Sequence, residues 1–161
     1  MKVLITGMSG TGKSTIVVEL AGAGYVALDL DEDGFSKWMP CDGNPTGANP
    51  GYDWVWNEER LDDRLRQNSD IPVFLAGCAP NMGRYVQQFD RVVLLTAPVE
   101  VLLNRVRSRS GNDYGKTTEE ADRIVANKNE VEPLLRRIAT HEVDASKPLA
   151  DVVNAIVDAT V

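Results

Sequence analysis

Short apolar segments of strand length alternate along the chain with longer segments of helical periodicity. This alternation predicts a parallel sheet that is covered by helices on both faces, which is the α/β class of fold. The predicted strands span residues 2–6, 25–30, 72–76, 91–96 and 142–144. The predicted helices span residues 13–23, 53–67, 83–88, 99–110, 118–140 and 148–160.

Glycines, prolines and one polar pair mark where these helices begin and end. Gly24 follows the first helix and Pro148 precedes the last, as is typical of helix termini. Thr117 and Glu120 have the spacing of a capping box. Pro133 falls inside the longest predicted helix and is expected to kink or split it.

The chain has 161 residues, of which 43% are hydrophobic, and this predicts a single globular domain over residues 1–161. Two long loops, 40–51 and 108–116, are rich in glycine and polar residues. Long loops in a small domain are more often functional than structureless. We therefore expect both loops to cover a substrate.

The formal net charge is −7, from 24 acidic and 17 basic residues. A chain of this sign has no general attraction for nucleic acid or for anionic membranes. No segment approaches the roughly 18 consecutive apolar residues of a membrane span, and the N-terminal segment is a core strand rather than a signal peptide. We therefore expect a cytoplasmic protein, monomeric or homodimeric, with Cys41 and Cys78 as free thiols.

The most specific motif is Gly7-x-x-x-x-Gly12-Lys13-Ser14, which lies between the first predicted strand and the first predicted helix. This is the phosphate-binding loop, or Walker A pattern, in the context that it needs. The glycines let backbone N–H groups converge on an anion, and the helix N-terminus adds a favourable field. Lys13 is expected to reach the β- and γ-phosphates, and the Ser14 hydroxyl to bind Mg²⁺. The expected nucleotide contacts in the loop are Gly7, Ser9, Gly10, Thr11, Gly12, Lys13, Ser14 and Thr15.

Two carboxylates, Asp29 and Asp31, stand at the end of the second predicted strand. Ligands of an open parallel sheet bind beyond the carboxyl ends of its strands, so these side chains are expected beside the phosphate loop. Asp29 is expected to help hold Mg²⁺. Asp31 is expected to accept the proton of an attacking hydroxyl, as a carboxylate does in phosphoryl transfer to an alcohol.

The phosphate loop, the Asp-x-Asp pair and the segment VVLLTAPVEVLLNRVRSR resemble the small P-loop kinases, a group that includes shikimate, gluconate and nucleoside-monophosphate kinases. The segment PLLRRIAT, followed by VDAS and Pro148, is especially similar to shikimate kinase. The resemblance implies a sheet of five parallel strands in the order 2-3-1-4-5. It also implies the use of ATP and Mg²⁺, an acceptor-binding region over about residues 31–70 and a lid over about residues 108–118.

The resemblance assigns roles to residues far from the phosphate loop. Arg105 matches the arginine that stacks on adenine, and Arg109 lies one helical turn further, where it would point to the phosphates. Lys116 is a second cation of the lid. The other side of the adenine would be covered by Ala145, Ser146 and Pro148.

The chain departs from shikimate kinase where that family grips its substrate's carboxylate with arginines. Residues 53–59 and Val131 occupy these places, and neither provides an arginine. A bidentate guanidinium is what holds a carboxylate, so shikimate is not the expected acceptor. If the acceptor is nevertheless acidic, Arg84 and Arg136 are the first candidates to bind it.

Aromatic residues fill the acceptor region instead, namely Trp38, Tyr52, Trp54 and Trp56. They form either a local hydrophobic mini-core or a stacking surface for a ring-bearing acceptor. Hydrogen bonds from Asn57, Glu58 and Asn81 are expected to assist. The candidate acceptor-binding residues are Asp31, Trp54, Trp56, Gly77, Cys78 and Arg84.

Together these patterns predict an ATP- and Mg²⁺-dependent kinase of a small hydroxylated or nucleotide-like acceptor. Lys13, Asp31 and Arg109 are the candidate catalytic residues, and Ser14 and Asp29 are the candidate metal ligands. The alternative is a nucleotide-dependent regulatory ATPase, or switch, without a small-molecule acceptor.

Overall fold

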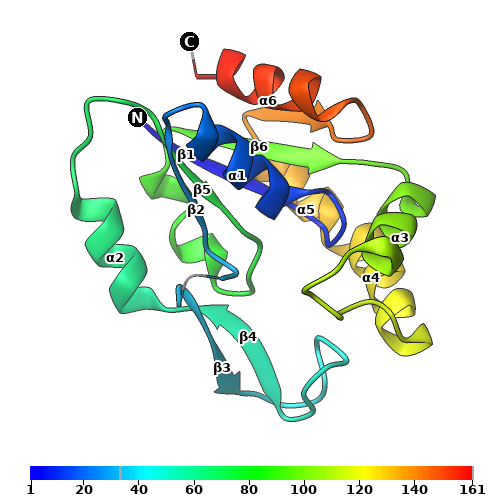
Figure 1. Ribbon diagram of the computed structural model, residues 1–161. Helices are drawn as coiled ribbons and strands as arrows, with labels where there is room; N and C mark the ends of the chain where they lie inside the picture. The colour runs from blue at the N-terminus through cyan, green and yellow to red at the C-terminus, as the bar shows by residue number, and fades with distance from the viewer. Residues whose placement is uncertain (33, 161) are drawn as a thin grey trace.

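A sheet of five parallel strands forms the centre of the molecule (Figure 1). The computed structural model describes residues 1–32 and 34–160. In spatial order the strands are β2 (Val26–Asp29), β5 (Val73–Ala76), β1 (Lys2–Gly7), β6 (Arg91–Thr96) and β7 (His141–Asp144). Counted along the chain within this sheet alone, the order is 2-3-1-4-5, so the predicted P-loop kinase fold is confirmed.

Helices cover both faces of this sheet, because its strands are apolar on both sides. Val3 and Ile5 of β1 point to one face and Leu4 points to the other. The first face is covered by α1 (Lys13–Gly22) and α6 (Leu149–Asp158). The second is covered by α2 (Glu58–Arg66), α5 (Glu132–Ile138) and the short 3₁₀ turns η1 (Met82–Arg84) and η2 (Val86–Gln88).

Two further helices, α3 (Val99–Ser108) and α4 (Thr118–Glu130), follow β6 and lie beyond the carboxyl end of the sheet (Figure 1). The predicted helix over 118–140 is split, because α4 ends at Glu130 and α5 begins at Glu132 with Pro133 in its first turn. The capping box of Thr117 and Glu120 is present at the start of α4. No helix among the described residues has the length and apolar character that crossing a bilayer requires.

The predicted helix over residues 53–67 is wrong in its first part. Residues 52–56 form strand β4 (Tyr52–Trp56), which pairs antiparallel with β3 (Ser36–Pro40) in a separate hairpin. Alternating aromatic residues favour this pairing: Trp54 lies opposite Trp38, and the centroids of their rings are 4.9 Å apart. Helix α2 begins only after Asn57, whose side chain accepts a hydrogen bond from the Arg60 N–H.

The predicted helix over residues 83–88 is likewise replaced by the turns η1 and η2.

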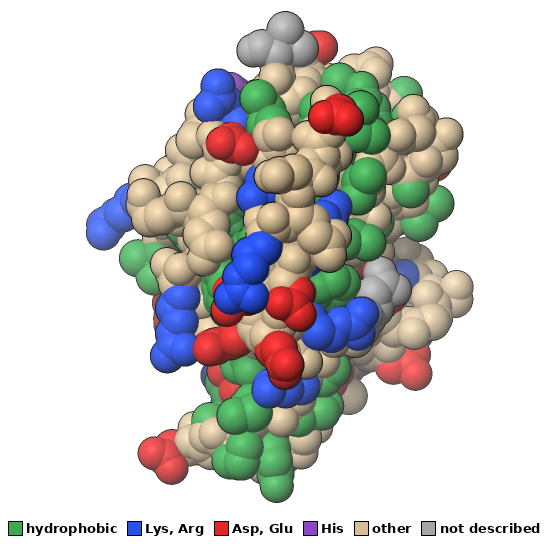
Figure 2. Space-filling model, turned by 90° about the vertical axis from the view of Figure 1, so that its left-hand side faces the viewer, with side chains coloured by type: hydrophobic (Ala, Val, Ile, Leu, Met, Phe, Trp, Pro, Cys, Tyr) green, Lys and Arg blue, Asp and Glu red, His purple; other side chains and the backbone are tan. Residues whose placement is uncertain are grey.

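Figure 2 shows the side of the molecule that carries α2, where acidic and basic side chains intermingle above a group of hydrophobic side chains. Arg66 of α2 pairs with Asp62 and Asp63 on this surface. The exposed hydrophobic residues of the hairpin are Trp38, Met39 and Tyr52.

Candidate active site

The loop between β1 and α1 has a shape that only glycine permits at two of its positions. A Cβ atom at Gly7 would lie 2.6 Å from the carbonyl oxygen of Leu95, and one at Gly10 would lie 2.6 Å from that of Leu102. Both glycines have positive φ angles. The buried Thr11 hydroxyl donates to the Met8 carbonyl at 2.8 Å, so this side chain shapes the loop from within.

Lys13 reaches back over this loop from the first turn of α1. Its Nζ donates to the Gly7 carbonyl at 2.8 Å and approaches the Met8 carbonyl at 3.5 Å. Ser14 and Thr15 follow in the same turn, and both are exposed. The ammonium group, the hydroxyl groups and the free N–H groups of a helix N-terminus therefore gather at one place, which suits a polyphosphate.

Asp29 and Asp31 lie at the carboxyl end of β2. Asp29 is only 5% exposed, and its Oδ1 accepts a hydrogen bond from the Asp31 N–H at 3.0 Å. Its Oδ2 is buried without a hydrogen-bond partner within the described part of the chain. A buried carboxylate oxygen that lacks a partner is costly, so this atom is suited to a cation or to water bound to a cation.

A cavity of about 120 Å³ connects the phosphate loop with Asp31. It is lined by Gly7, Met8, Ser9, Lys13, Asp31, Cys78, Ile124 and Asn127. Ile124 and Asn127 come from α4 and were missed by sequence reasoning, since they belong to no motif. The one signal in the sequence is that Asn127 is polar and lies one helical turn after the apolar Ile124.

Opposing effects act on the protonation of Asp31. Burial raises the pKa of its carboxyl group, and the neighbouring Asp29 raises it further. The positive charge of Lys13, the hydrogen bond from the Cys78 N–H and the proximity of the Trp56 indole lower the pKa. Lys13 and Asp31 both line the cavity, so the ammonium group and the carboxyl group border the same space.

Gly77 and Cys78 follow β5 and pack directly against Asp31. The Cys78 N–H donates to Asp31 Oδ1 at 3.4 Å. A Cβ atom at Gly77 would lie 3.0 Å from the same oxygen, so the carboxylate occupies the space of the missing side chain. Burial raises the pKa of the Cys78 thiol, which therefore remains protonated at neutral pH. Both Cys41 and Cys78 are free cysteines.

The two tryptophans that are predicted to contact the acceptor, Trp54 and Trp56, lie in different surroundings. Trp54 is partly buried, packs on Trp38 and donates its indole N–H to the Asp31 carbonyl at 3.2 Å. Trp56 is 0% exposed and belongs to the core, where its ring lies 6.2 Å from that of Tyr85. Trp56 thus matches the mini-core interpretation, whereas Trp54 stays at the edge of the hairpin.

The other predicted polar contacts of the acceptor region already have partners. Arg84 is exposed and pairs with Glu58 at 2.6 Å, and it does not line the cavity. The Asn57 side chain caps α2, and Asn81 is bonded to the backbone of Trp56. These residues therefore fasten α2 and the loop after β5 to the hairpin.

Arg109 and Lys116 lie in the segment between α3 and α4. Arg109 donates to the carbonyl groups of Asn112 and Tyr114, at 3.2 and 2.7 Å, and so holds the folded loop together. Burial lowers the pKa of its guanidinium, while the nearby Tyr114 and Glu32 raise it. Lys116 pairs with Asp113 at 2.6 Å.

The remaining predicted nucleotide contacts lie on α3 and after β7. Arg105 is half-buried on α3, and Ala145 is buried directly after β7. The N–H and hydroxyl groups of Ser146 both donate to Asp144 Oδ1, so this side chain shapes the turn that leads to Pro148.

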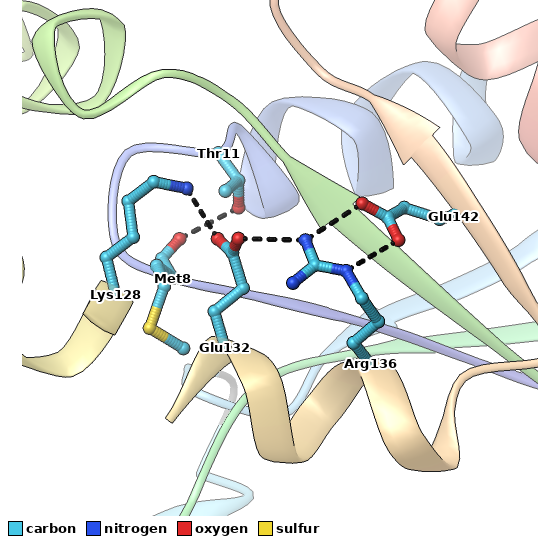
Figure 3. Close-up of polar contacts among 6 residues, drawn as sticks. All are labelled: Met8, Thr11, Lys128, Glu132, Arg136 and Glu142. Carbon is cyan, nitrogen blue, oxygen red and sulfur yellow. Dashed lines mark hydrogen bonds and ion pairs between the residues drawn. The ribbon is translucent and has the colours of Figure 1, made fainter. Parts of the chain in front are cut away.

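Behind the phosphate loop, a buried glutamate gathers two cations (Figure 3). Glu132 is 5% exposed and pairs with Lys128 at 2.8 Å and with Arg136 at 3.1 Å. Arg136 also binds Glu142 through two nitrogens, at 2.9 and 3.0 Å. The charge of Arg136 is therefore compensated on both sides, which disfavours this residue as a ligand for an acidic acceptor.

The loop of the hairpin meets the start of α4. A Cβ atom at Gly47 would lie 3.8 Å from Cγ of Glu120 and 4.0 Å from Cγ of Glu119. The hairpin loop therefore contacts the helix whose Ile124 lines the cavity.

Comparison with solved structures shows the same fold in several kinases. A shikimate kinase from Acinetobacter baumannii in complex with shikimate matches with a TM-score of 0.67 and 19% identity, over 98% of this chain and 90% of that chain. A gluconokinase from Sinorhizobium meliloti 1021 matches with a TM-score of 0.56 and 18% identity, over 98% of this chain and 90% of that chain. A deoxyadenosine kinase from M. mycoides with bound dATP matches with a TM-score of 0.58 and 14% identity, over 98% of this chain and 97% of that chain.

These similarities confirm the predicted resemblance to the P-loop small-molecule kinases at the level of the fold. No curated protein sequence matches the chain. A family model described as an AAA domain matches residues 3–134, which include the phosphate loop, Asp29 and Asp31. Since this match covers most of the chain, the protein belongs to that family of AAA domains.

Proposed function

We propose that this protein is a kinase that uses ATP and Mg²⁺ to phosphorylate a hydroxyl group of a small molecule. The observation that carries the proposal is the cavity that joins Lys13 of the phosphate loop to Asp31. A phosphate-binding loop alone fits any nucleotide hydrolase. A partly buried carboxylate in the same cavity as its lysine supplies in addition the group that an alcohol acceptor needs.

The triphosphate would be held by the backbone N–H groups of the phosphate loop and by Lys13. When a phosphate enters, the ammonium group exchanges the Gly7 carbonyl for a phosphate oxygen. Arg105 and the turn at Ala145, Ser146 and Pro148 would hold the adenine. Arg109 would neutralise charge on the transferring group once the segment that it holds closes over the site.

The residues present also fit a magnesium ion. The unpartnered Oδ2 of Asp29 and the exposed hydroxyl of Ser14 are both hard oxygen donors of the kind that Mg²⁺ prefers. When bound, the ion would neutralise charge on the β- and γ-phosphates.

The acceptor would lie between Asp31 and the hairpin. Asp31 would take the proton of the attacking hydroxyl, and Gly77, Cys78 and Trp54 would form the adjoining wall. Among the described residues that line the cavity, Lys13 is the only cation, and it would be committed to the phosphates. An acceptor with a carboxylate at this wall would have no cation to pair with, so the proposal disfavours shikimate as the acceptor.

A screen of candidate acceptors tests this function. The purified full chain is incubated with Mg-ATP and a panel of sugars, polyols, nucleosides, nucleoside monophosphates and shikimate, and ADP is measured. We expect one class of compound to raise ADP formation well above the level without acceptor, and shikimate to have no effect. The Lys13→Ala variant is the control. Turnover that no compound stimulates would instead support the nucleotide-dependent switch.

A further inference from the structure

Trp56 carries the one buried indole N–H among the described residues that has no hydrogen-bond partner. The side chain is 0% exposed, so bulk solvent does not reach this donor. A buried donor without a partner destabilises the fold, which is unexpected for a residue whose ring otherwise only fills space. Its orientation therefore needs an explanation.

The position of Trp56 is fixed from two sides. The Asn81 side chain accepts a hydrogen bond from the backbone N–H of Trp56 and donates one to the backbone carbonyl of Trp56, both at 3.0 Å, so one side chain holds the end of β4. The indole ring packs against Tyr85 in the core. Because Asn81 and Tyr85 both follow β5, the ring is tied to the segment that also carries Gly77 and Cys78.

The edge of the indole that carries the N–H borders the space beside the Asp31 carboxylate. A Cβ atom at Gly77 would lie 3.1 Å from Cζ2 of Trp56 and 3.0 Å from Oδ1 of Asp31, so both groups border the same small space. Cζ2 lies on the same edge of the indole as Nε1. The Trp56 indole also lowers the pKa of Asp31, as a donor that approaches the carboxylate would.

We propose that Trp56 is a positioning residue: its indole N–H holds the Asp31 carboxylate toward the phosphate loop through a hydrogen bond. Trp54 complements it by donating to the Asp31 backbone carbonyl at 3.2 Å, so two indoles of one strand hold the backbone and the carboxylate of a single residue. The role assigned to Asp31 rests on the proposed function, whereas the hydrogen bond itself does not.

The hydrogen bond is tested by NMR without any acceptor. Indole N–H resonances are recorded for the ¹⁵N-labelled full chain and assigned with Trp38→Phe and Trp54→Phe, which leaves Trp56 by elimination. In Asp31→Asn the Trp56 resonance should move upfield, because a neutral amide oxygen is a weaker acceptor than a carboxylate. Asp53→Asn is the matched control, since this carboxylate bonds only the backbone of Trp54, and it should leave the Trp56 resonance in place.

The positioning role is tested by turnover of Mg-ATP. The acceptor is the panel compound that gives the highest rate, or water if none does. Trp56→Phe keeps the ring but removes the N–H, and we expect about a tenfold lower kcat, the effect of one hydrogen bond to a charged group, with an unchanged KM for ATP. Tyr85→Phe, a change in the same part of the core, should leave kcat unchanged.

The two measurements test different parts of the proposal. A Trp56 resonance that does not respond to Asp31→Asn overturns the hydrogen bond. A resonance that moves, together with an unchanged kcat in Trp56→Phe, overturns the positioning role. If no panel compound is phosphorylated, the proposed function fails, while the NMR result still decides whether the indole holds Asp31.

Discussion

Lys13 and Asp31 carry opposite charges on two sides of one small cavity, and their surroundings give them unequal freedom. Lys13 is held by carbonyl groups of the phosphate loop, and a phosphate can replace these hydrogen-bond partners. Asp31 is enclosed by Gly77, the Cys78 N–H and two indoles. The cation is thus free to follow the phosphate, whereas the carboxylate is fixed.

The first prediction concerns Lys13. In Lys13→Ala we expect turnover of Mg-ATP to fall by about 10²-fold or more, because one lost contact to a developing phosphoryl charge has this effect. The fold should stay intact, as judged by circular dichroism. Lys37→Ala, at an exposed lysine of β3, is the control. Wild-type turnover in Lys13→Ala would exclude the phosphate-loop interpretation.

The second prediction concerns Gly77. An alanine there would push its Cβ against Asp31, Leu30 and Trp56, with distances of 3.0 to 3.1 Å. We expect a loss of about 1–3 kcal/mol in the free energy of unfolding, measured with urea, and a lower kcat because the carboxylate is displaced. Gly83→Ala is a matched control, since a Cβ at Gly83 meets nothing within 4 Å. Equal effects of both substitutions would contradict the close packing around Asp31.

At the scale of elements, the sequence predicts best where one local rule governs a segment. The phosphate loop, its flanking strand and helix, the split at Pro133 and the five parallel strands all follow from local patterns. The hairpin does not. Its β4 strand alternates aromatic residues over only five positions and runs directly into the helical segment EERLDDRLR, so the helical periodicity masked the strand.

The candidate site divides in the same way. Lys13 and Asp31 come from short motifs on adjacent segments, and the topology of a parallel sheet brings such motifs together. Ile124 and Asn127 reach the cavity from a helix that is distant in sequence, and the burial of Trp56 depends on Asn81 and Tyr85, which are also distant. Tertiary packing decides these positions, and no local pattern encodes them.

The third prediction tests how the hairpin is attached. Asn81→Ala leaves both backbone groups of Trp56 without partners, so we expect the free energy of unfolding to fall by about 2 kcal/mol. Arg84→Ala lies in the same loop and removes an exposed ion pair, which typically contributes only about 0–1 kcal/mol. Urea titrations of both variants measure the difference. A larger loss in Arg84→Ala would refute the assignment of Asn81 as the main fastening.

At the scale of the whole molecule, the network of Lys128, Glu132, Arg136 and Glu142 joins α4, α5 and β7. It connects the helix that lines the cavity to the far edge of the sheet. The hydrogen bond from Arg136 holds the pKa of Glu142 below its ordinary value of 4.5. The pair therefore stabilises the fold fully above that pH and loses its contribution as the pH falls below it.

The fourth prediction follows from this pair. Glu142→Gln removes the group that titrates, so the decline in unfolding free energy between pH 7 and pH 4 should be smaller than in the wild type. Glu19→Gln, at an exposed glutamate of α1, should leave the decline unchanged. Urea unfolding at both pH values measures this. Identical declines in Glu142→Gln and the wild type would show that the ion pair does not contribute to acid sensitivity.

The hairpin forms its own two-stranded sheet and shares no strand pairing with the central one. Its ties to the nucleotide-binding half include the hydrogen bond from the Trp54 indole to the Asp31 carbonyl and the two hydrogen bonds between Trp56 and Asn81. Substitutions or insertions in its loop can therefore reshape the proposed acceptor wall without changing the strands that flank the phosphate loop. Related proteins with this architecture can diverge in what they phosphorylate while their nucleotide chemistry stays the same.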